Sequence, residues 1–371
     1  MTVFKLFFTG DFLDEKGEVR RDIGLSALAK TGYIETGFLR DQRPTPGDNN
    51  YWDRLYSLEV TPDNVAQANG IVIFRPWVKA SAFVNGAAEL IVLARTGAGY
   101  DKIDVAACTT NDVAVCNSPH TLTHSTASAA LTLMLALAKK LPQQQDLVRT
   151  GRWDRQGEFL GDDLVGQTLG IIGLGKTGSE LARLVAPFHM NLVAYSPSAD
   201  PLQAEESLGV KFVELDVLLR ISDFVSLHCR LDERTRHMLG PRELGLLKPT
   251  AYLINVARGE LIQEDALVEA LSEKRIAGAG LDVFETEPLP VSSPLLDLDN
   301  VVLTPHWLPS THRADAATRN VVMHAALRAA QGLVPQHVVN PEVLGRSGFR
   351  AKLARFASNE GQHVARTKVR R

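Results

Sequence analysis

The feature that most constrains this chain is a glycine-rich turn between an apolar run and an amphipathic segment. The turn reads Gly173-Leu174-Gly175-Lys176-Thr177-Gly178, and it joins the apolar residues 169–172 to the amphipathic residues 179–185. The first glycine permits a tight turn, the second lets a pyrophosphate approach the backbone, and the third lets a helix pack closely on a strand. A helix N-terminus at this place favours phosphate groups through its N–H groups and its dipole. The turn therefore predicts a dinucleotide-binding unit of strand, turn and helix.

The rest of the chain shows strands alternating with helices. Apolar runs bounded by polar or turn residues are typical of parallel strands that are buried on both faces. Amphipathic segments lie between several of these runs, and Thr61-Pro62-Asp63 has the residue types of a helix start. This alternation predicts an α/β fold with doubly wound parallel sheets. The apolar runs are 4–8, 71–74, 90–94, 169–172, 192–195, 224–227 and 252–255, and the amphipathic segments are 179–185, 214–220 and 264–271.

Length and composition limit the class of protein. The chain has 371 residues, of which 45% are hydrophobic and 22% are charged, so we expect a globular protein of two or three domains. The formal net charge of −3 gives no reason to expect nucleic acid or an acidic membrane as a partner. The most apolar stretch, residues 127–138, is too short for a membrane span and predicts a helix buried between domains or subunits.

The cysteines and the two ends of the chain also carry expectations. Three cysteines (Cys108, Cys116 and Cys229) make no disulfide framework and no Cys-x-x-Cys pair, which favours a reducing compartment and no metal site. The first eight residues lack the apolar run of a signal peptide, so we expect a cytoplasmic protein. Residues 341–371 contain eight Lys and Arg residues against two Glu residues. We interpret them as a solvated basic tail, with a terminal helix as the alternative.

The second cofactor signal is the residue that ends the next apolar run. Proteins that bind NAD carry an acid there, about 20 residues after the glycine turn, which binds the ribose hydroxyls. This chain has Ser196 at that position, and no Lys or Arg lies between Arg183 and Lys211 to meet a 2′-phosphate. Asp200 and Glu205 are acids within reach of the ribose. We therefore expect NAD as the cofactor and leave NADP open.

Four polar residues stand just after later apolar runs, where ligands of open α/β sheets bind. They are Arg258, Asp282, Glu287 and His306. An arginine binds a planar carboxylate through two parallel hydrogen bonds. A histidine beside a glutamate suits proton transfer near neutral pH, because the carboxylate stabilises the charged imidazole. Judged on the residues alone, Glu285 is an equal candidate for that glutamate.

These segments closely resemble the D-isomer-specific 2-hydroxyacid dehydrogenases. The resemblance covers roughly residues 71–340. It implies two Rossmann-like domains with a cleft between them, and reversible hydride transfer between a nicotinamide cofactor and a 2-keto or 2-hydroxy acid. The motifs that carry it are Ala94-Arg95-Thr96-Gly97-Ala98-Gly99-Tyr100-Asp101-Lys102-Ile103-Asp104, Ser226-Leu227-His228, Asn255-Val256-Ala257-Arg258-Gly259-Glu260, the segment 280–288, and Leu303-Thr304-Pro305-His306.

The resemblance also implies a catalytic role for three residues. Arg258 would bind the carboxylate and the keto oxygen of the substrate. His306 would give a proton to that oxygen in reduction or take it in oxidation. The register of the family motif favours Glu287 over Glu285 as the partner of His306.

The remaining implied roles concern binding. Arg75 and the backbone amides of Ala98 and Gly99 would help to bind the substrate carboxylate. Trp77 and Trp307 depart from the family pattern and would either border the substrate or pack at an interface. The residues implied for the cofactor are Gly173, Gly175, Lys176, Thr177, Gly178, Ser196, Val256, Ala257 and Asp282.

The family organisation predicts a substrate domain that is split in the sequence. Residues 1–118 and 306–340 would form it, residues 119–305 would form the NAD-binding domain, and 341–371 would be the basic tail. A homodimer is expected, with glyoxylate or hydroxypyruvate as the first substrates to consider. The alternative is a non-enzymatic NADH-binding regulator, similar to corepressors of the same fold that keep the Arg, Glu and His set.

Overall fold

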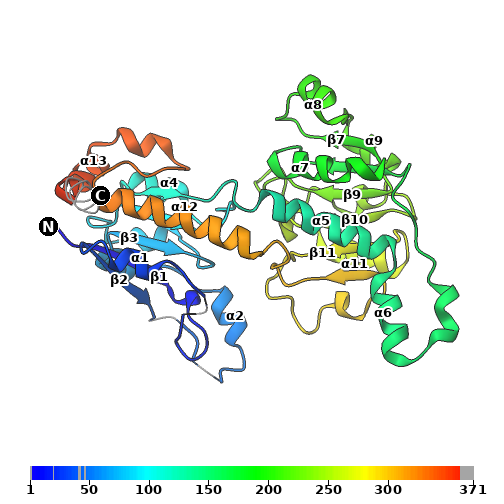
Figure 1. Cartoon of the computed structure of the whole chain (residues 1–371), viewed down its shortest axis with the longest axis horizontal. Coiled ribbons are helices and arrows are strands. Elements are labelled where there is room, and N and C mark those ends of the chain that lie inside the picture. The colour runs from blue at the N-terminus through cyan, green and yellow to red at the C-terminus, as the bar shows by residue number, and fades with distance from the viewer. Residues whose placement is uncertain (1, 20, 41–42, 46, 360–371) are drawn as a thin grey trace, which may run out of the picture. The chain divides into compact units, whose positions relative to one another are not determined.

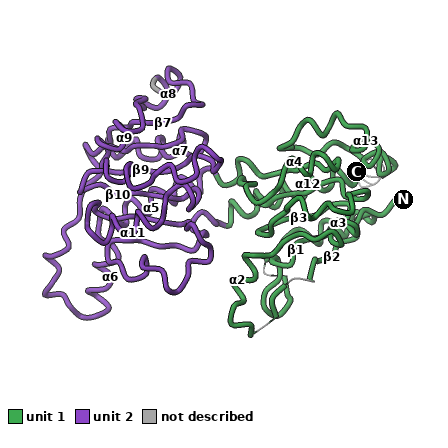
Figure 2. The backbone as a smooth tube through the Cα atoms, turned by 180° about the vertical axis from the view of Figure 1, so that it is seen from behind, with its two compact units in different colours: residues 1–122, 312–371 green, residues 123–311 purple. Residues whose placement is uncertain are grey.

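The chain folds into two compact units. The computed structural model describes residues 2–19, 21–40, 43–45 and 47–359. Unit 1 comprises residues 1–122 and 312–371, and unit 2 comprises residues 123–311. Figure 2 shows that unit 1 is made from the two outer parts of the chain, while unit 2 is a single continuous stretch.

Unit 1 contains a five-stranded parallel sheet of order β2-β1-β3-β4-β5. Its strands are β1 (Phe4–Thr9), β2 (Ile34–Leu39), β3 (Gly70–Ile73), β4 (Val92–Arg95) and β5 (Ala114–Cys116). Its helices are α1 (Leu25–Ala29), α2 (Tyr51–Tyr56), α3 (Pro62–Gln67), α4 (Val105–Thr110), α12 (His312–Ala330) and α13 (Ser347–Ala354). The predicted helix start is confirmed, because the Thr61 side chain accepts a hydrogen bond from Asn64 N at the start of α3.

Unit 2 contains a seven-stranded parallel sheet of order β12-β11-β10-β9-β6-β7-β8. Its strands are β6 (Thr168–Ile172), β7 (Asn191–Tyr195), β8 (Lys211–Phe212), β9 (Phe224–Leu227), β10 (Tyr252–Asn255), β11 (Gly278–Leu281) and β12 (Val301–Leu303). Its helices are α5 (Thr123–Ala138), α6 (Leu141–Thr150), α7 (Lys176–Val185), α8 (Pro201–Leu208), α9 (Leu215–Ile221), α10 (Pro241–Leu244) and α11 (Glu264–Ser272).

The strand sequences explain how the sheets are buried. Every residue of β3, β9, β10 and β11 is buried, as expected for parallel strands covered on both faces. The apolar stretch 127–138 lies in α5, which packs against α7 in unit 2 (Figure 1). A Cβ on Gly280 of β11 would lie 2.9 Å from the Cβ of Leu133, so this glycine lets α5 approach the sheet closely. The predicted α/β class with two parallel-sheet domains is confirmed.

Residues 341–359 differ from the solvated tail that their charge suggested. Phe349, Leu353 and Phe356 are buried in the core of unit 1, and the Phe356 ring is 5.1 Å from that of Phe4. The Lys352 Nζ atom donates hydrogen bonds to the backbone oxygens of Leu90, Asn111 and Asp112. This part of the chain therefore belongs to the unit 1 fold, while residues 360–371 lie outside the described residues.

Within the ranges described above, no helix combines the length and the apolar character needed to cross a membrane.

Candidate active site

The glycine turn has the geometry of a pyrophosphate site. It lies between β6 and α7, and Gly173 has a φ of +95°, a conformation that favours glycine. A Cβ on Gly173 would lie 2.5 Å from the backbone nitrogen of Cys229, and one on Gly178 would overlap the carbonyl oxygen of Gly173. A Cβ on Gly175 would meet no atom within 4 Å, so the backbone there is open to a ligand. Gly173 thus permits the tight turn, Gly175 leaves the backbone open to a ligand, and Gly178 allows the helix to pack closely on the strand.

Lys176, Thr177 and Ser196 lie around the same turn. Lys176 and Thr177 are the first two residues of α7, and the glycine before them has no side chain with which to cap the helix. Gly173 donates a backbone hydrogen bond of 2.9 Å to Tyr195 O, which brings the buried Ser196 beside the turn. The structure therefore groups these three residues near the positive end of the α7 dipole, where phosphate groups are favoured.

His228 is adjacent to this turn, because β9 pairs with β6 in the sheet. Its Nε2 atom is 2.8 Å from Ser226 Oγ, and burial lowers the pKa of His228 to about 4. Its imidazole is therefore neutral near pH 7, which argues against His228 as a proton donor there.

Asp282 is a fully buried carboxyl group that follows β11. Its Oδ1 atom accepts hydrogen bonds from Thr304 Oγ1 (2.7 Å) and from the backbone nitrogens of Trp307 and Leu308 (3.1 Å each). Its Oδ2 atom is buried without a hydrogen-bond partner, and burial raises the pKa of the carboxyl. An acceptor left in this state fits the amide group of a nicotinamide, which donates N–H.

Arg258 is held by a turn that follows β10. Asn255, the buried last residue of β10, accepts a hydrogen bond from Ala257 N (3.0 Å) and donates one to Arg258 O (2.8 Å). The Arg258 Nη1 atom donates to Ala257 O at 2.7 Å. The sequence reasoning missed Asn255, although a polar residue that closes an apolar run was a signal for such a role. Val256 lies within this turn.

His306 and Glu287, the pair predicted to transfer a proton, lie within hydrogen-bond distance of each other. His306 Nδ1 lies 2.8 Å from Glu287 Oε2 and 2.9 Å from Glu287 Oε1, so this contact uses one of the two ring nitrogens. The His306 side chain is 40% exposed and that of Glu287 is 16% exposed. His306 has a φ of +51°, and its neighbours Trp307 and Leu308 are the residues whose N–H groups Asp282 binds. Asp282 therefore supports the backbone that presents His306.

The structure separates the two glutamates that the residues alone left open, and it agrees with the family register, which favoured Glu287. Glu285 Oε1 is 2.6 Å from His237 Nε2, and its Oε2 accepts a hydrogen bond from Glu264 N. Glu287, and not Glu285, contacts His306.

The residues predicted to bind the substrate carboxylate belong to unit 1. Arg75 follows β3, and its guanidinium lies 4.1 Å from the Phe74 ring centroid and 3.9 Å from the buried Asp11. Ala98 follows Gly97, which has a φ of +126°, and Ala98 O accepts a hydrogen bond from Asn117 Nδ2. Gly99 comes next in the same loop. Arg75 thus follows β3, and Ala98 and Gly99 lie in the loop after β4. The two strands are neighbours in the parallel sheet of unit 1.

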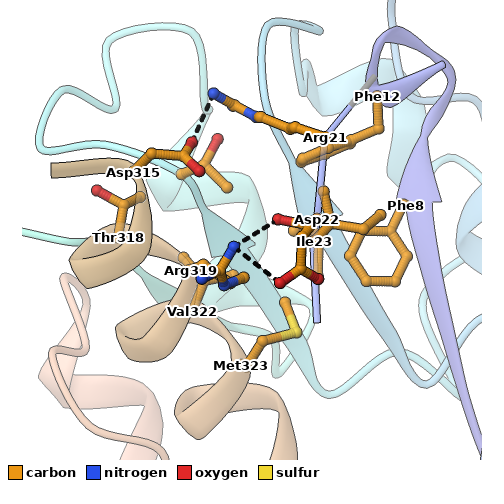
Figure 3. Close-up of a pocket in the computed structure, with 12 residues that line it drawn as sticks. Phe8, Phe12, Arg21, Asp22, Ile23, Asp315, Thr318, Arg319, Val322 and Met323 are labelled. Carbon is orange, nitrogen blue, oxygen red and sulfur yellow. Dashed lines mark hydrogen bonds and ion pairs between the residues drawn. The ribbon is translucent and has the colours of Figure 1, made fainter. Parts of the chain in front are cut away.

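A small pocket of unit 1 lies between α12 and the segment that carries Arg21 and Asp22 (Figure 3). Two ion pairs border it, Arg21 with Asp315 at 2.6 Å and Arg319 with Asp22 at 3.2 Å. Its cavity volume is about 30 Å³. Neither Arg75 nor the loop after β4 beyond Thr96 lines it, so we assign it no substrate.

The arrangement in unit 2 can bind an anion and exchange a proton at one edge of its sheet. Arg258, Asp282 and His306 follow β10, β11 and β12, which are adjacent parallel strands. The carboxyl ends of such strands meet at one edge, where ligands bind. No three His, Cys, Asp or Glu side chains gather as a metal site in the part of the chain that the structure describes.

The known proteins with similar sequences and folds include 2-hydroxyacid dehydrogenases and related reductases. A family model described as "D-isomer specific 2-hydroxyacid dehydrogenase, NAD binding domain" matches residues 131–307. The glyoxylate reductase of Thermococcus litoralis is 41% identical over 313 residues, which are 80% of this chain and 94% of that protein. The D-3-phosphoglycerate dehydrogenase of Methanocaldococcus jannaschii is 41% identical over 258 residues, 69% of this chain and 49% of that protein.

A solved structure shows the same similarity in three dimensions. The glyoxylate reductase from Paecilomyes thermophila has a TM-score of 0.76 at 27% identity. The match covers 92% of this chain and 100% of that one.

Proposed function

Because this chain belongs to the D-isomer-specific 2-hydroxyacid dehydrogenase family, we propose that Arg258, Glu287 and His306 carry out its NAD-dependent reaction. The reaction converts a small 2-keto acid and the D-2-hydroxy acid into one another. The observation that carries the assignment is the contact of 2.8 Å between His306 Nδ1 and Glu287 Oε2. It lies at the sheet edge that also carries Arg258 and Asp282.

Each catalytic residue has one task in reduction. NADH, when bound, supplies the hydride that reaches C2 of the keto acid. The carbonyl oxygen then needs a proton, which protonated His306 gives from Nε2. Glu287 accepts the Nδ1–H hydrogen bond, orients the ring and stabilises its positive charge before the transfer. Arg258 binds the substrate carboxylate with two parallel hydrogen bonds and so sets the distance of C2 from the imidazole.

The cofactor residues are proposed from the same edge of the unit 2 sheet. Gly173, Gly175, Lys176, Thr177 and Gly178 would bind the pyrophosphate at the start of α7. Ser196 would lie at the ribose, where its hydroxyl neither repels nor neutralises a 2′-phosphate. NAD is the cofactor proposed, with NADP as the alternative. Val256 and Ala257 would border the nicotinamide, and Asp282 Oδ2 would accept a hydrogen bond from its amide.

The binding of the acid is proposed to involve unit 1. Arg75 and the backbone amides of Ala98 and Gly99 would add to the positive field around the substrate carboxylate. Unit 1 is accordingly assigned as the substrate domain and unit 2 as the cofactor domain. Glyoxylate or hydroxypyruvate is the substrate proposed, since a glyoxylate reductase is 41% identical to this chain.

A homodimer in the cytoplasm is the proposed state of the protein. Leu141, Val148 and Trp153, on α6 and the turn after it, are 58%, 59% and 63% exposed, and an apolar surface of this kind favours association. The three cysteines are free, which fits a reducing compartment.

A panel of keto acids tests the reaction. Glyoxylate, hydroxypyruvate, pyruvate and 3-phosphohydroxypyruvate are each mixed with NADH or NADPH, and the loss of absorbance of the reduced cofactor is followed. We expect turnover with glyoxylate or hydroxypyruvate and faster turnover with NADH. The absence of turnover with every acid would contradict the proposal.

Two variants test the residue roles in the same assay. His306→Gln should lose about 10²-fold or more in kcat while NADH fluorescence still reports binding, because only proton transfer is removed. Arg258→Ala should chiefly raise KM for the keto acid. His312→Gln, at an exposed histidine, is the control. A near-wild-type rate in His306→Gln, or unchanged substrate saturation in Arg258→Ala, would contradict the respective role.

A further inference from the structure

Glu285 and Glu287 are separated by one residue, and their side chains contact different partners in unit 2. Glu287 contacts the imidazole of His306, whereas both carboxylate oxygens of Glu285 are bound elsewhere. The proposed reaction assigns a role to Glu287 and none to Glu285. The contacts of Glu285 show what it does to the segment that carries Glu287.

Glu285 and Glu264 bind each other's backbone. Glu264 N donates to Glu285 Oε2 at 3.1 Å, and Glu285 N donates to Glu264 Oε2 at 3.0 Å. Glu264 is the first residue of α11, where a carboxylate is favoured by the helix dipole. The two side chains thus close a reciprocal pair of hydrogen bonds between segment 283–287 and the start of α11.

His237 completes the environment of Glu285. Its Nε2 atom is 2.6 Å from Glu285 Oε1, and its own backbone nitrogen donates to Glu260 O at 2.7 Å. One carboxylate therefore joins segment 283–287 to α11 and, through His237, to the turn that contains Glu260.

The backbone after Arg258 packs directly on the segment that Glu285 anchors. A Cβ on Gly259 would overlap the carbonyl group of Phe284 and crowd the backbone nitrogen of Glu285. Only glycine allows this approach, so the position of Arg258 is fixed against residues 284–285. On the same segment, Phe284 N donates to Glu287 Oε1 at 3.3 Å, and Glu287 in turn orients His306.

We propose that Glu285 is a positioning residue for the reaction, which fixes segment 284–287 and through it the relative placement of Arg258 and the Glu287–His306 pair. It touches neither the reacting atoms nor the cofactor. The inference rests on the proposed roles of Arg258, Glu287 and His306.

The test compares Glu285→Ala with Glu285→Gln. Alanine removes both side-chain contacts of residue 285. Glutamine keeps them, because its carbonyl oxygen accepts from Glu264 N while its amide donates to His237 Nε2. In the cofactor-free protein, proton NMR should show the His306 Nδ1–H signal far downfield, assigned by its loss in His306→Gln. We expect that signal to weaken or shift in Glu285→Ala and to return in Glu285→Gln.

Steady-state kinetics supply the second readout. Displacement of a catalytic group by about 1 Å costs about 10²-fold, so Glu285→Ala should lose about 10- to 100-fold in kcat/KM for the keto acid. NADH affinity should stay near the wild-type value, since the glycine turn is unchanged. Glu285→Gln should recover most of the rate.

The controls separate this inference from the proposed function. Asp216→Ala removes a carboxylate that pairs with Arg242 and should change neither readout. If Glu285→Ala does not fold, His237→Ala, at a partly exposed side chain, should produce a smaller change in the same direction. An unchanged NMR signal and an unchanged kcat/KM in Glu285→Ala, or in His237→Ala as its substitute, would overturn the inference. A Glu285→Gln variant as impaired as Glu285→Ala would also overturn it. An inactive wild type would overturn the proposed function and leave the NMR comparison valid.

Discussion

At the scale of single residues, His228 links burial to the pH dependence of stability. Burial lowers its pKa from 6.5 in the unfolded chain to about 4 in the folded protein. Between these values the unfolded chain binds a proton that the folded protein does not. The free energy of unfolding therefore falls as pH drops from 6.5 to 4, by about 1–3 kcal/mol from this residue.

Urea unfolding at pH 7, 5.5 and 4.5 measures this contribution. The wild type should lose more stability than His228→Gln across the interval, because glutamine binds no proton and can still bond Ser226 Oγ. His312→Gln, at an exposed position, should follow the wild type. Equal pH dependence in the wild type and His228→Gln would contradict the assignment.

Residue identity predicted which polar groups lie at the sheet edge better than it predicted the partners of those groups. Arg258 and His306 were visible because each is a polar residue after an apolar run, within a motif. The residues alone left the choice between Glu285 and Glu287 open, because residues two apart in an irregular segment have no fixed side. The register of the family motif favoured Glu287, which is the glutamate that contacts His306. The choice depends on which side chain meets Glu264 N and His237, and both lie far away in sequence.

At the scale of elements, the close approach of Gly259 to residues 284–285 fixes the two segments that carry the proposed catalytic residues against each other. We expect Gly259→Ala to lower kcat/KM by about 10- to 100-fold, because the added Cβ overlaps the Phe284 carbonyl group and must displace the Arg258 backbone. The assay is keto-acid reduction, with NADH binding measured alongside it.

A matched control exists in the same unit. A Cβ on Gly157 would meet no atom within 4 Å, so Gly157→Ala should leave both measurements unchanged. Wild-type kinetics in Gly259→Ala would show that the segment can move without consequence for Arg258.

Strands and helices were predictable from the sequence where a local pattern of residues was enough to specify them. The glycine turn and the apolar runs specify strands of a parallel sheet by their own composition. A terminal helix such as α13 was only the alternative to a solvated tail, because its basic residues suggest solvation when their partners are unknown. In the structure Lys352 binds three backbone oxygens, Arg346 pairs with Asp112 at 2.5 Å and Arg355 pairs with Glu89. These acceptors lie more than 200 residues earlier in the chain, so local composition could not reveal them.

At the scale of the whole molecule, the chain leaves unit 1, completes unit 2 and returns. Each unit has its own hydrophobic core, and the returning part contributes Val322, Phe349 and Phe356 to the core that also contains Phe4. A change in that core should therefore lower the stability of unit 1 while leaving the core of unit 2 intact.

Phe349→Ala tests this division. Phe349 is fully buried, and loss of such a ring costs about 3–5 kcal/mol. Two of the four tryptophans lie in each unit, Trp52 and Trp77 in unit 1 and Trp153 and Trp307 in unit 2. A variant that keeps only one of these pairs reports by tryptophan fluorescence on the unfolding of one unit, so two such variants separate the two transitions. We expect Phe349→Ala to shift the unit 1 transition to lower urea concentration, with the unit 2 transition and NADH binding retained. Val84→Ala, at an exposed residue of unit 1, is the control. Equal shifts of both transitions would mean that the two cores unfold as one, and that the C-terminal segment stabilises the whole molecule rather than unit 1.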